Sequence, residues 1–178
     1  QIVGYAGRRD PLYEQTTPAP FLGASGWFLA STYLPLAGLS RETVSWHNIL
    51  KCRWNHTNDL PKGAEYEEAV KICTETYLRI PPSATTIIAH GAASWAFFQG
   101  PDKPITEWRG YCGDEWHGRR VYATLHTADC LRDPHARFLA RLDWKKLRHL
   151  RDEQWPNPLP EPTVASEASR ADFLRLLT

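Results

Sequence analysis

The chain of 178 residues has the length of one domain, or of one domain with a short appendage. Hydrophobic residues make up 42% and charged residues 23%, as in ordinary globular proteins whose core needs no disulfide or metal support. No run of about 18 apolar residues occurs, which excludes a membrane-spanning helix. The formal net charge of +1 does not by itself indicate a polyanionic partner.

Short strand-like runs alternate with longer helical runs along the chain. We expect four strands, at 2–5, 43–50, 85–89 and 121–125. Helices are expected between and after them, at about 25–34, at about 64–79, around 95–98 and from 133–134 to about 151. An edge hairpin is expected near 108–116. Ser25 is expected to cap the first helix, and Pro35 and Gly38 to end it. This alternation predicts an α/β protein with a parallel sheet.

The last part of the chain differs in composition. Residues 155–162 are rich in proline and predict a linker, and residues 166–177 read as the start of another helix. We therefore divide the chain into a domain at 1–151 and an appendage at 152–178. The appendage either leads to a further, covalently linked domain or folds back as a tail. The opening Gln1-Ile2-Val3, inside an apolar run and without Met, also predicts a piece of a longer protein.

The four cysteines form no C-x-x-C pair. Since no secretory signal is present, their spacing favours reduced thiols or metal ligands over disulfide bonds and predicts a cytoplasmic protein.

Three side chains near predicted strand ends suit a planar heterocycle. Phe21 offers an aromatic face, Asn48 an amide that can pair with a ring edge, and His126 an imidazole for a developing charge. Each has an ordinary alternative: a core aromatic, an amide that serves the backbone, or a histidine after a buried strand. Because the carboxyl ends of parallel strands meet at one edge, the three are expected to lie together.

Ordered motifs resemble the uracil-DNA glycosylase superfamily, most closely its iron–sulfur-containing bacterial and archaeal branch (families 4 and 5). They are Gly4-x-Ala6, the run Pro-Phe-Leu-Gly-Ala-Ser-Gly at 20–26, the run His-Asn-Ile-Leu-Lys-Cys-Arg at 47–53, and His126 followed by Leu-Arg-Asp-Pro at 131–134. The resemblance covers residues 1 to about 151. It implies a three-layer sandwich with a central four-stranded parallel sheet.

The resemblance also implies an activity, the hydrolysis of the N-glycosidic bond of uracil or a modified base flipped out of DNA. By position, Phe21 resembles the aromatic residue that stacks on the flipped base, and Asn48 the amide that reads its edge. His126 is similar to the histidine that stabilises the departing base anion. The segment 127–132 resembles the loop that enters the DNA where the base has left.

Two motifs depart from the family pattern. Tyr5 stands where the family's Gly-Glu-Ala-Pro-Gly motif has the carboxylate that positions water, and tyrosine is no general base at neutral pH. Asp10, Glu14 or Asp129 could substitute, and Tyr5 could narrow the wall of the substrate site. The histidine motif, usually His-Pro, is His126-Thr127. Either a different base is recognised, or catalysis is weak or lost.

Cys52 and Cys73 match the third and fourth cluster ligands of the iron–sulfur branch. The first pair would precede Gln1, so a [4Fe-4S] cluster is expected only if an N-terminal cysteine pair is missing from this chain, and no cofactor is otherwise predicted. Cys112 and Cys130 are an alternative second pair. The plain alternative is that Cys52 and Cys73 are buried as small apolar side chains.

Basic residues are the expected DNA contacts, with single- or double-stranded DNA as the partner. A local basic excess spans 119–151, although a solvated helix face explains residues 145–151 equally well. The predicted phosphate-binding residues on the loops are Arg8, Arg9, Lys51, Arg53 and Arg132.

Two functions therefore remain, in a bacterial, archaeal or phage-infected cell. The first is a DNA glycosylase. The alternative is a catalytically weak or inactive DNA-binding module within a larger replication or repair protein, such as a phage polymerase. An unrelated small-molecule α/β protein does not explain the ordered motifs.

Overall fold

A computed structural model describes residues 2–4, 20–51 and 61–151. Its sheet contains β1 (Ile2–Gly4), β2 (Trp46–Asn48), β3 (Thr86–His90) and β4 (Arg120–Thr124). The strands lie in the order β2-β1-β3-β4, and every pairing is parallel. The expectation of an α/β protein with a parallel sheet is confirmed.

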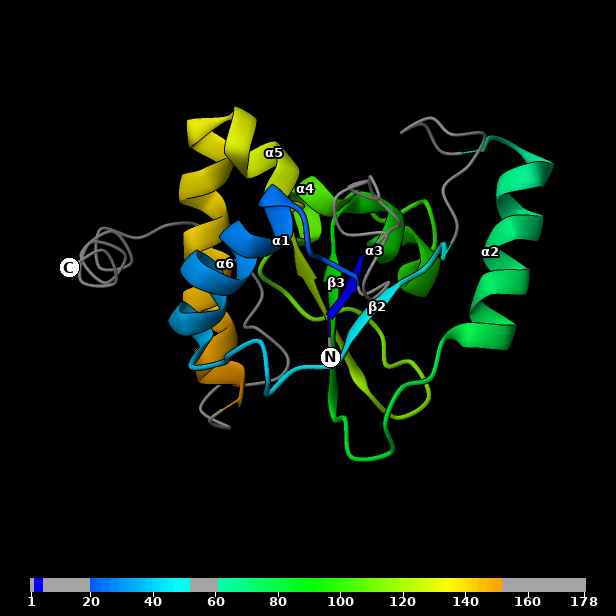
Figure 1. Ribbon diagram of the computed structural model, residues 1–178, viewed down its shortest axis with the longest axis horizontal. Helices are drawn as coiled ribbons and strands as arrows, with labels where there is room; N and C mark the ends of the chain where they lie inside the picture. Colours follow the sequence, from blue (N-terminus) through cyan, green and yellow to red (C-terminus); the bar gives the residue numbers. More distant parts are fainter. Residues whose placement is uncertain (1, 5–19, 52–60, 152–178) are drawn as a thin grey trace, which may run out of the picture.

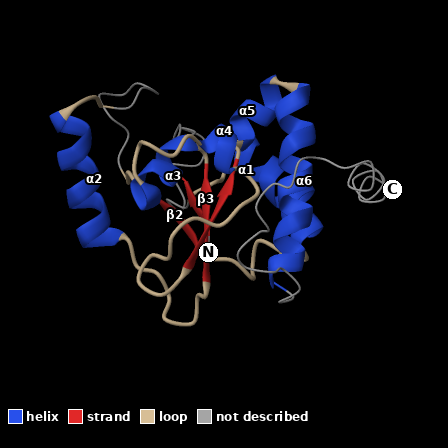
Figure 2. Ribbon diagram, turned by 180° about the vertical axis from the view of Figure 1, so that it is seen from behind, coloured by secondary structure: helices blue, strands red, loops and turns tan. Residues whose placement is uncertain are grey.

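The helices cover both faces of this sheet. They are α1 (Ala24–Phe28), α2 (Ala64–Tyr77), α3 (Ala92–Gln99), α4 (Ile105–Trp108), α5 (Thr127–Arg132) and α6 (Pro134–Arg151). Figure 1 shows α1 and α6 on one side of the sheet and α2 and α3 on the other, and Figure 2 shows the same arrangement from behind. None of the helices among the described residues is long and apolar enough to cross a membrane.

Two apolar clusters form the core, one on each face of the sheet. Because successive strand residues point to opposite faces, neighbours in sequence join different clusters. Ile88 packs in the cluster that contains Trp144 of α6, whereas Ile87 packs in the cluster that contains Trp95 of α3. All four side chains are almost completely buried.

Three local predictions are corrected. The first helix begins after Gly23, which takes the cap position, so Ser25 lies inside the first turn. The strand expected at 43–50 is only the three residues of β2, which pair with β1 in the described part of the chain. The edge hairpin near 108–116 is instead α4 followed by two isolated bridges, Cys112 with Tyr122 and Trp116 with Arg119.

Two predicted helix boundaries are confirmed, whereas Pro35, which was expected to end the first helix, lies inside the 3₁₀ helix Leu34–Ala37. Gly38 adopts a left-handed conformation with φ of 64° and ends the segment that follows α1. Asp133 accepts a hydrogen bond from the backbone N–H of His135, 2.8 Å away, just before α6, and Pro134 occupies the first position of that helix.

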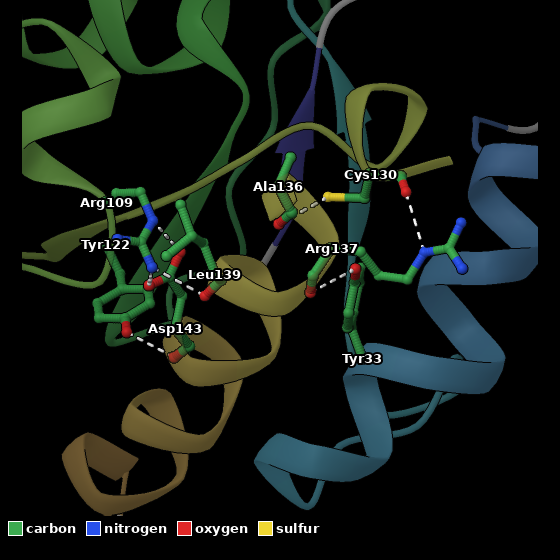
Figure 3. A network of polar contacts seen from close by, with 8 residues as sticks. All are labelled: Tyr33, Arg109, Tyr122, Cys130, Ala136, Arg137, Leu139 and Asp143. Carbon is green, nitrogen blue, oxygen red and sulfur yellow. Dashed lines mark hydrogen bonds and ion pairs between the residues drawn. The ribbon is translucent and has the colours of Figure 1, made fainter. Parts of the chain in front are cut away.

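Polar contacts fasten α6 to the rest of the domain (Figure 3). Arg109 donates two hydrogen bonds to the carboxylate of Asp143, over 2.7 and 3.1 Å, and the Tyr122 hydroxyl donates to the Asp143 carbonyl over 2.6 Å. At the other end of the network Tyr33 donates to the Arg137 carbonyl, and Arg137 donates to the Cys130 carbonyl. These bonds hold the middle of α6 against β4 and the start of α6 against α5.

Candidate active site

The carboxyl ends of the four strands form one row. At this edge Gly4 of β1 pairs with Asn48 of β2, and His90 of β3 pairs with Thr124 of β4. Between β1 and β3, Val3 pairs with Ala89, so the residues after them, Gly4 and His90, lie at the same level of the sheet. Asn48 therefore ends β2 at the same edge at which His90 ends β3. The half-buried Asn48 lies at the edge where the sequence predicted it.

Phe21 precedes α1 in a strained conformation. Its φ is 62°, a left-handed conformation that costs a bulky residue roughly 1–2 kcal/mol. Gly26 permits the turn, because a Cβ there would lie only 1.9 Å from the Phe21 carbonyl oxygen. The half-buried Phe21 ring lies 5.0 Å from the Trp46 ring and 6.0 Å from the His90 ring, between ring centroids.

Arg41 holds this turn in place. It donates to the carbonyl oxygens of Phe21, over 3.2 Å, and Pro20, over 3.1 Å. Its guanidinium also lies over the Trp46 ring, 4.7 Å from the centroid, while the Trp46 indole N–H donates to the Arg41 carbonyl. The role of Arg41 was not predicted from the sequence, because its partners are backbone carbonyls that no sequence motif marks.

His126 caps the first turn of α5. Its Nδ1 accepts a hydrogen bond from the backbone N–H of Ala128, 3.1 Å away. Because an acceptor nitrogen carries no proton, the neutral ring bears its proton on Nε2. Burial lowers the pKa of His126 below its ordinary value of 6.5, with Asp129 opposing that shift. The imidazole is therefore neutral at pH 7, with Nε2 as its donor.

Gly91 allows β3 to end directly beside this ring. Its φ is 92°, and a Cβ on Gly91 would lie 2.9 Å from the His126 Cβ and 3.2 Å from its ring carbon Cδ2. A side chain at position 91 would thus be strained and would also push His126 aside.

His90, which the sequence analysis also missed, lies between Phe21 and His126. Its ring centroid is 5.0 Å from that of His126, and only 1% of the residue is exposed. Its Nε2 lies 3.1 Å from both the backbone N and the hydroxyl of Thr127, and its Nδ1 lies 3.0 Å from the Thr124 hydroxyl. Burial, reinforced by His126, holds the pKa of His90 well below 6.5, so this ring is neutral.

Of the predicted phosphate-binding residues, Lys51 and Arg132 are described. Lys51 is half-buried, and burial lowers its pKa. Arg132 on α5 is exposed and pairs with Asp129 over 2.7 Å. The predicted residues outside the described part of the chain are Tyr5, Arg8, Arg9, Asp10, Glu14, Cys52 and Arg53.

The three described cysteines, Cys73, Cys112 and Cys130, form no disulfide bond with one another. Cys73 is buried on α2, and its sulfur lies 3.5 Å from the backbone N of Lys51, the residue before Cys52. Cys130 belongs to the core cluster on the α6 side, and Cys112 bridges to β4. No group of three metal-binding side chains occurs within the described ranges. These residues alone do not fit a four-thiolate cluster.

Comparison with known proteins agrees with this architecture. No protein-family model matches the chain. The type-4 uracil-DNA glycosylase of Archaeoglobus fulgidus is 31% identical over 160 residues, which cover 87% of this chain and 78% of that protein. The enzyme of the same name from Sulfurisphaera tokodaii is 28% identical over 83% of this chain and 69% of its own length. That from Thermotoga maritima is 30% identical over 74% of this chain and 67% of its own length.

The protein is thus an α/β domain whose parallel sheet carries an amide, two imidazoles and a phenylalanine with positive φ at its carboxyl edge. Together with the similarity over most of both chains, this architecture places the protein in a family: the chain belongs to the uracil-DNA glycosylases.

Proposed function

We propose that the protein is a DNA glycosylase that hydrolyses the N-glycosidic bond of uracil or a modified base after the base is flipped out of DNA. The observation that carries this proposal is the state of His126. Its Nδ1 accepts the Ala128 amide, so the ring offers an Nε2–H donor at the edge where Asn48 ends β2. The relatives named as uracil-DNA glycosylases support the same class of reaction.

His126 acts on the departing base. As the bond between C1′ and the base nitrogen breaks, its electron pair moves onto the base and negative charge collects on the base oxygen. A preorganised donor at that oxygen stabilises the charge without reorganising in the transition state, a contribution of roughly 2.7–4 kcal/mol for one such donor. The water oxygen then bonds to C1′, and the proton that it loses ends on the base anion, which leaves as the neutral base.

Phe21 and Asn48 recognise the flipped base. Phe21 supplies a ring face for stacking, and the bonds from Arg41 hold its carbonyl in the turn that sets the ring's direction. Asn48 supplies a donor and an acceptor to the edge of a pyrimidine. Flipping costs a few kcal/mol of lost stacking and pairing, which these contacts offset.

The group that positions the attacking water is proposed to be Asp10 or Glu14, with Tyr5 at the wall of the substrate site. Asp129 suits this role less well, because it lies on α5 and pairs with Arg132. Lys51 and Arg132 contact DNA phosphates in this proposal, together with Arg8, Arg9 and Arg53. Cys52 and Cys73 remain candidate ligands of a [4Fe-4S] cluster that also needs an upstream cysteine pair, and no catalytic step depends on it.

One observation favours a second function, a DNA-binding module with little or no catalysis. Tyr5 replaces the carboxylate of the family motif, and a phenol with a pKa near 10 does not activate water at neutral pH. Such a module would still need the basic residues proposed above to contact the DNA phosphates.

An abasic-site assay separates the two functions. Single- and double-stranded oligonucleotides carry uracil, hydroxymethyluracil, hypoxanthine or a modified cytosine, and binding is measured on the same samples. We expect one base to be excised, with a loss of about 10²–10³-fold in His126→Ala. His149→Ala, which removes an exposed histidine on α6, is the matched control and should keep the wild-type rate.

Salt-sensitive binding without excision of any base would instead establish the DNA-binding module. Excision that survives His126→Ala unchanged would show that the role given to this histidine is wrong.

A further inference from the structure

The first two backbone donors of α5 are both satisfied by histidine rings. Thr127 N–H donates to Nε2 of His90, and Ala128 N–H donates to Nδ1 of His126. The N-terminal amides of a helix have no partner within the helix and must find one elsewhere. Here one partner comes from β3, a distant segment, and the other from the residue that caps the helix.

The hydrogen bonds of His90 allow only one arrangement of its proton. A backbone N–H can only donate, so Nε2 of His90 carries no proton, and Nδ1–H donates to the Thr124 hydroxyl. The Thr127 hydroxyl also lies within 3.1 Å of Nε2 and donates to it. His90, Thr124 and Thr127 are all nearly inaccessible to solvent, so none of them can touch a substrate.

We propose that His90 is a positioning residue for His126: by accepting the N–H of Thr127 it fixes the first turn of α5, on which the His126 ring is oriented. The inference rests on the proposed function for its catalytic consequence. Its structural part, the fixed Nε2–H form of His126, does not depend on any activity.

The residue that follows His126 at the first position of α5 is a threonine. A proline at the first helical position has no N–H to satisfy and a fixed φ. Threonine has a buried N–H and a hydroxyl, and His90 accepts hydrogen bonds from both. His90 and Thr127 together thus perform the fixing that proline achieves alone.

The experiment compares four variants in multiple-turnover excision, with kcat and KM measured separately. His90→Leu keeps the bulk and removes the acceptor. His90→Gln restores an acceptor, since its amide oxygen can reach the Thr127 N–H. Thr127→Pro removes the donor, and the double variant His90→Leu with Thr127→Pro needs no acceptor. The protonation of His126 is read from its ¹⁵N ring signals, assigned with His126→Gln.

We expect His90→Leu to lower kcat by on the order of 10–100-fold, with KM changed less than about twofold. We also expect its His126 signals to lose the single Nε2–H form. His90→Gln and the double variant should recover most of the rate and the single form. A His90→Leu variant that keeps both the wild-type rate and the wild-type His126 signals would overturn the proposal. So would a loss that the double variant does not recover.

If the wild-type protein excises no base, the proposed function fails and the ¹⁵N comparison still decides the inference. Unchanged His126 signals in folded His90→Leu would then refute it. If His90→Leu does not fold, the same comparison is made between wild type and His90→Gln, where loss of the single Nε2–H form would refute it.

Discussion

Two polar clusters contact neighbouring residues of α6, Asp143 and Trp144, and they differ in charge. The histidine cluster comprises His90, Thr124, His126 and Thr127, and its members are neutral. The arginine–aspartate cluster comprises Arg109, Tyr122 and Asp143, and it contains an ion pair whose carboxylate is fully buried. Trp144, next to Asp143 in α6, packs edge-on against the His90 ring.

The difference lies in what each cluster's bonds hold. In the histidine cluster, the hydrogen bonds from Thr127 and Ala128 hold the first turn of α5, so the loss of one of them changes the direction of the His126 imidazole. Those of the arginine–aspartate cluster tie α4 and β4 to the middle of α6, so a lost bond leaves a charge buried without its partner. We therefore expect the first cluster to govern rate and the second to govern stability.

The largest expected effect on stability comes from Asp143→Ala. Removing one partner of a buried pair leaves the other charge uncompensated, and Arg109 is only 19% exposed. The free energy of unfolding, measured by urea denaturation, should fall by about 3–5 kcal/mol.

The matched control is Asp129→Ala, which breaks the exposed pair with Arg132. Exposed pairs contribute about 0–1 kcal/mol, so this variant should unfold nearly as the wild type does. Equal losses in the two variants would contradict the assignment of a stabilising role to Asp143.

The free energy of unfolding should change with pH in opposite directions for the two clusters. Since the pKa of His90 is lowered by burial, the folded state leaves it neutral while the unfolded state takes a proton near pH 6.5. Its contribution is present above that pH and is lost as the pH falls. Relative to His90→Gln, the wild type should therefore lose stability as the pH falls from 7 to 5.

Asp143 should act in the opposite direction. Burial raises its pKa to about 7, although the Arg109 guanidinium opposes the shift. A raised carboxyl pKa contributes stability at low pH that is lost as the pH rises through about 7. Relative to Asp143→Asn, the wild type should therefore become less stable between pH 4 and pH 8. Urea denaturation at several pH values measures both differences, and slopes of the same sign would refute the comparison.

Sequence patterns predicted the elements that are determined locally. The range of α6 follows from Asp133-Pro134 at its start and from the apolar spacing that buries Ala140, Trp144 and Leu147. α2 ends close to its predicted boundary. Asn48 and His126 were predicted at the edge of the sheet because strand ends in a parallel sheet share that edge.

Sequence patterns did not predict residues whose partners are backbone groups of distant segments. His90 reads as one more residue of a buried strand, and only the fold brings Thr127 N–H to its ring. The left-handed conformation of Phe21 is equally hidden, because phenylalanine does not signal a positive φ as glycine does. Arg41 is separated from Phe21 by 20 residues, and it bonds an oxygen atom that every residue has.

The smallest expected effect on activity comes from replacing Arg41, whose guanidinium lies over the Trp46 ring beside Phe21. Arg41→Ala removes the two hydrogen bonds that hold the carbonyls of Phe21 and Pro20, and the strained turn can then relax. Because a hydrogen bond from a charged donor contributes about 1.5 kcal/mol, kcat/KM should fall about tenfold.

Arg79→Ala is the matched control, since this exposed arginine also donates to carbonyl oxygens, at the end of α2. The fall should appear mainly in KM, because Phe21 is proposed to bind the base rather than to stabilise its charge. A fall confined to kcat would instead place Phe21 with His126 in the chemical step.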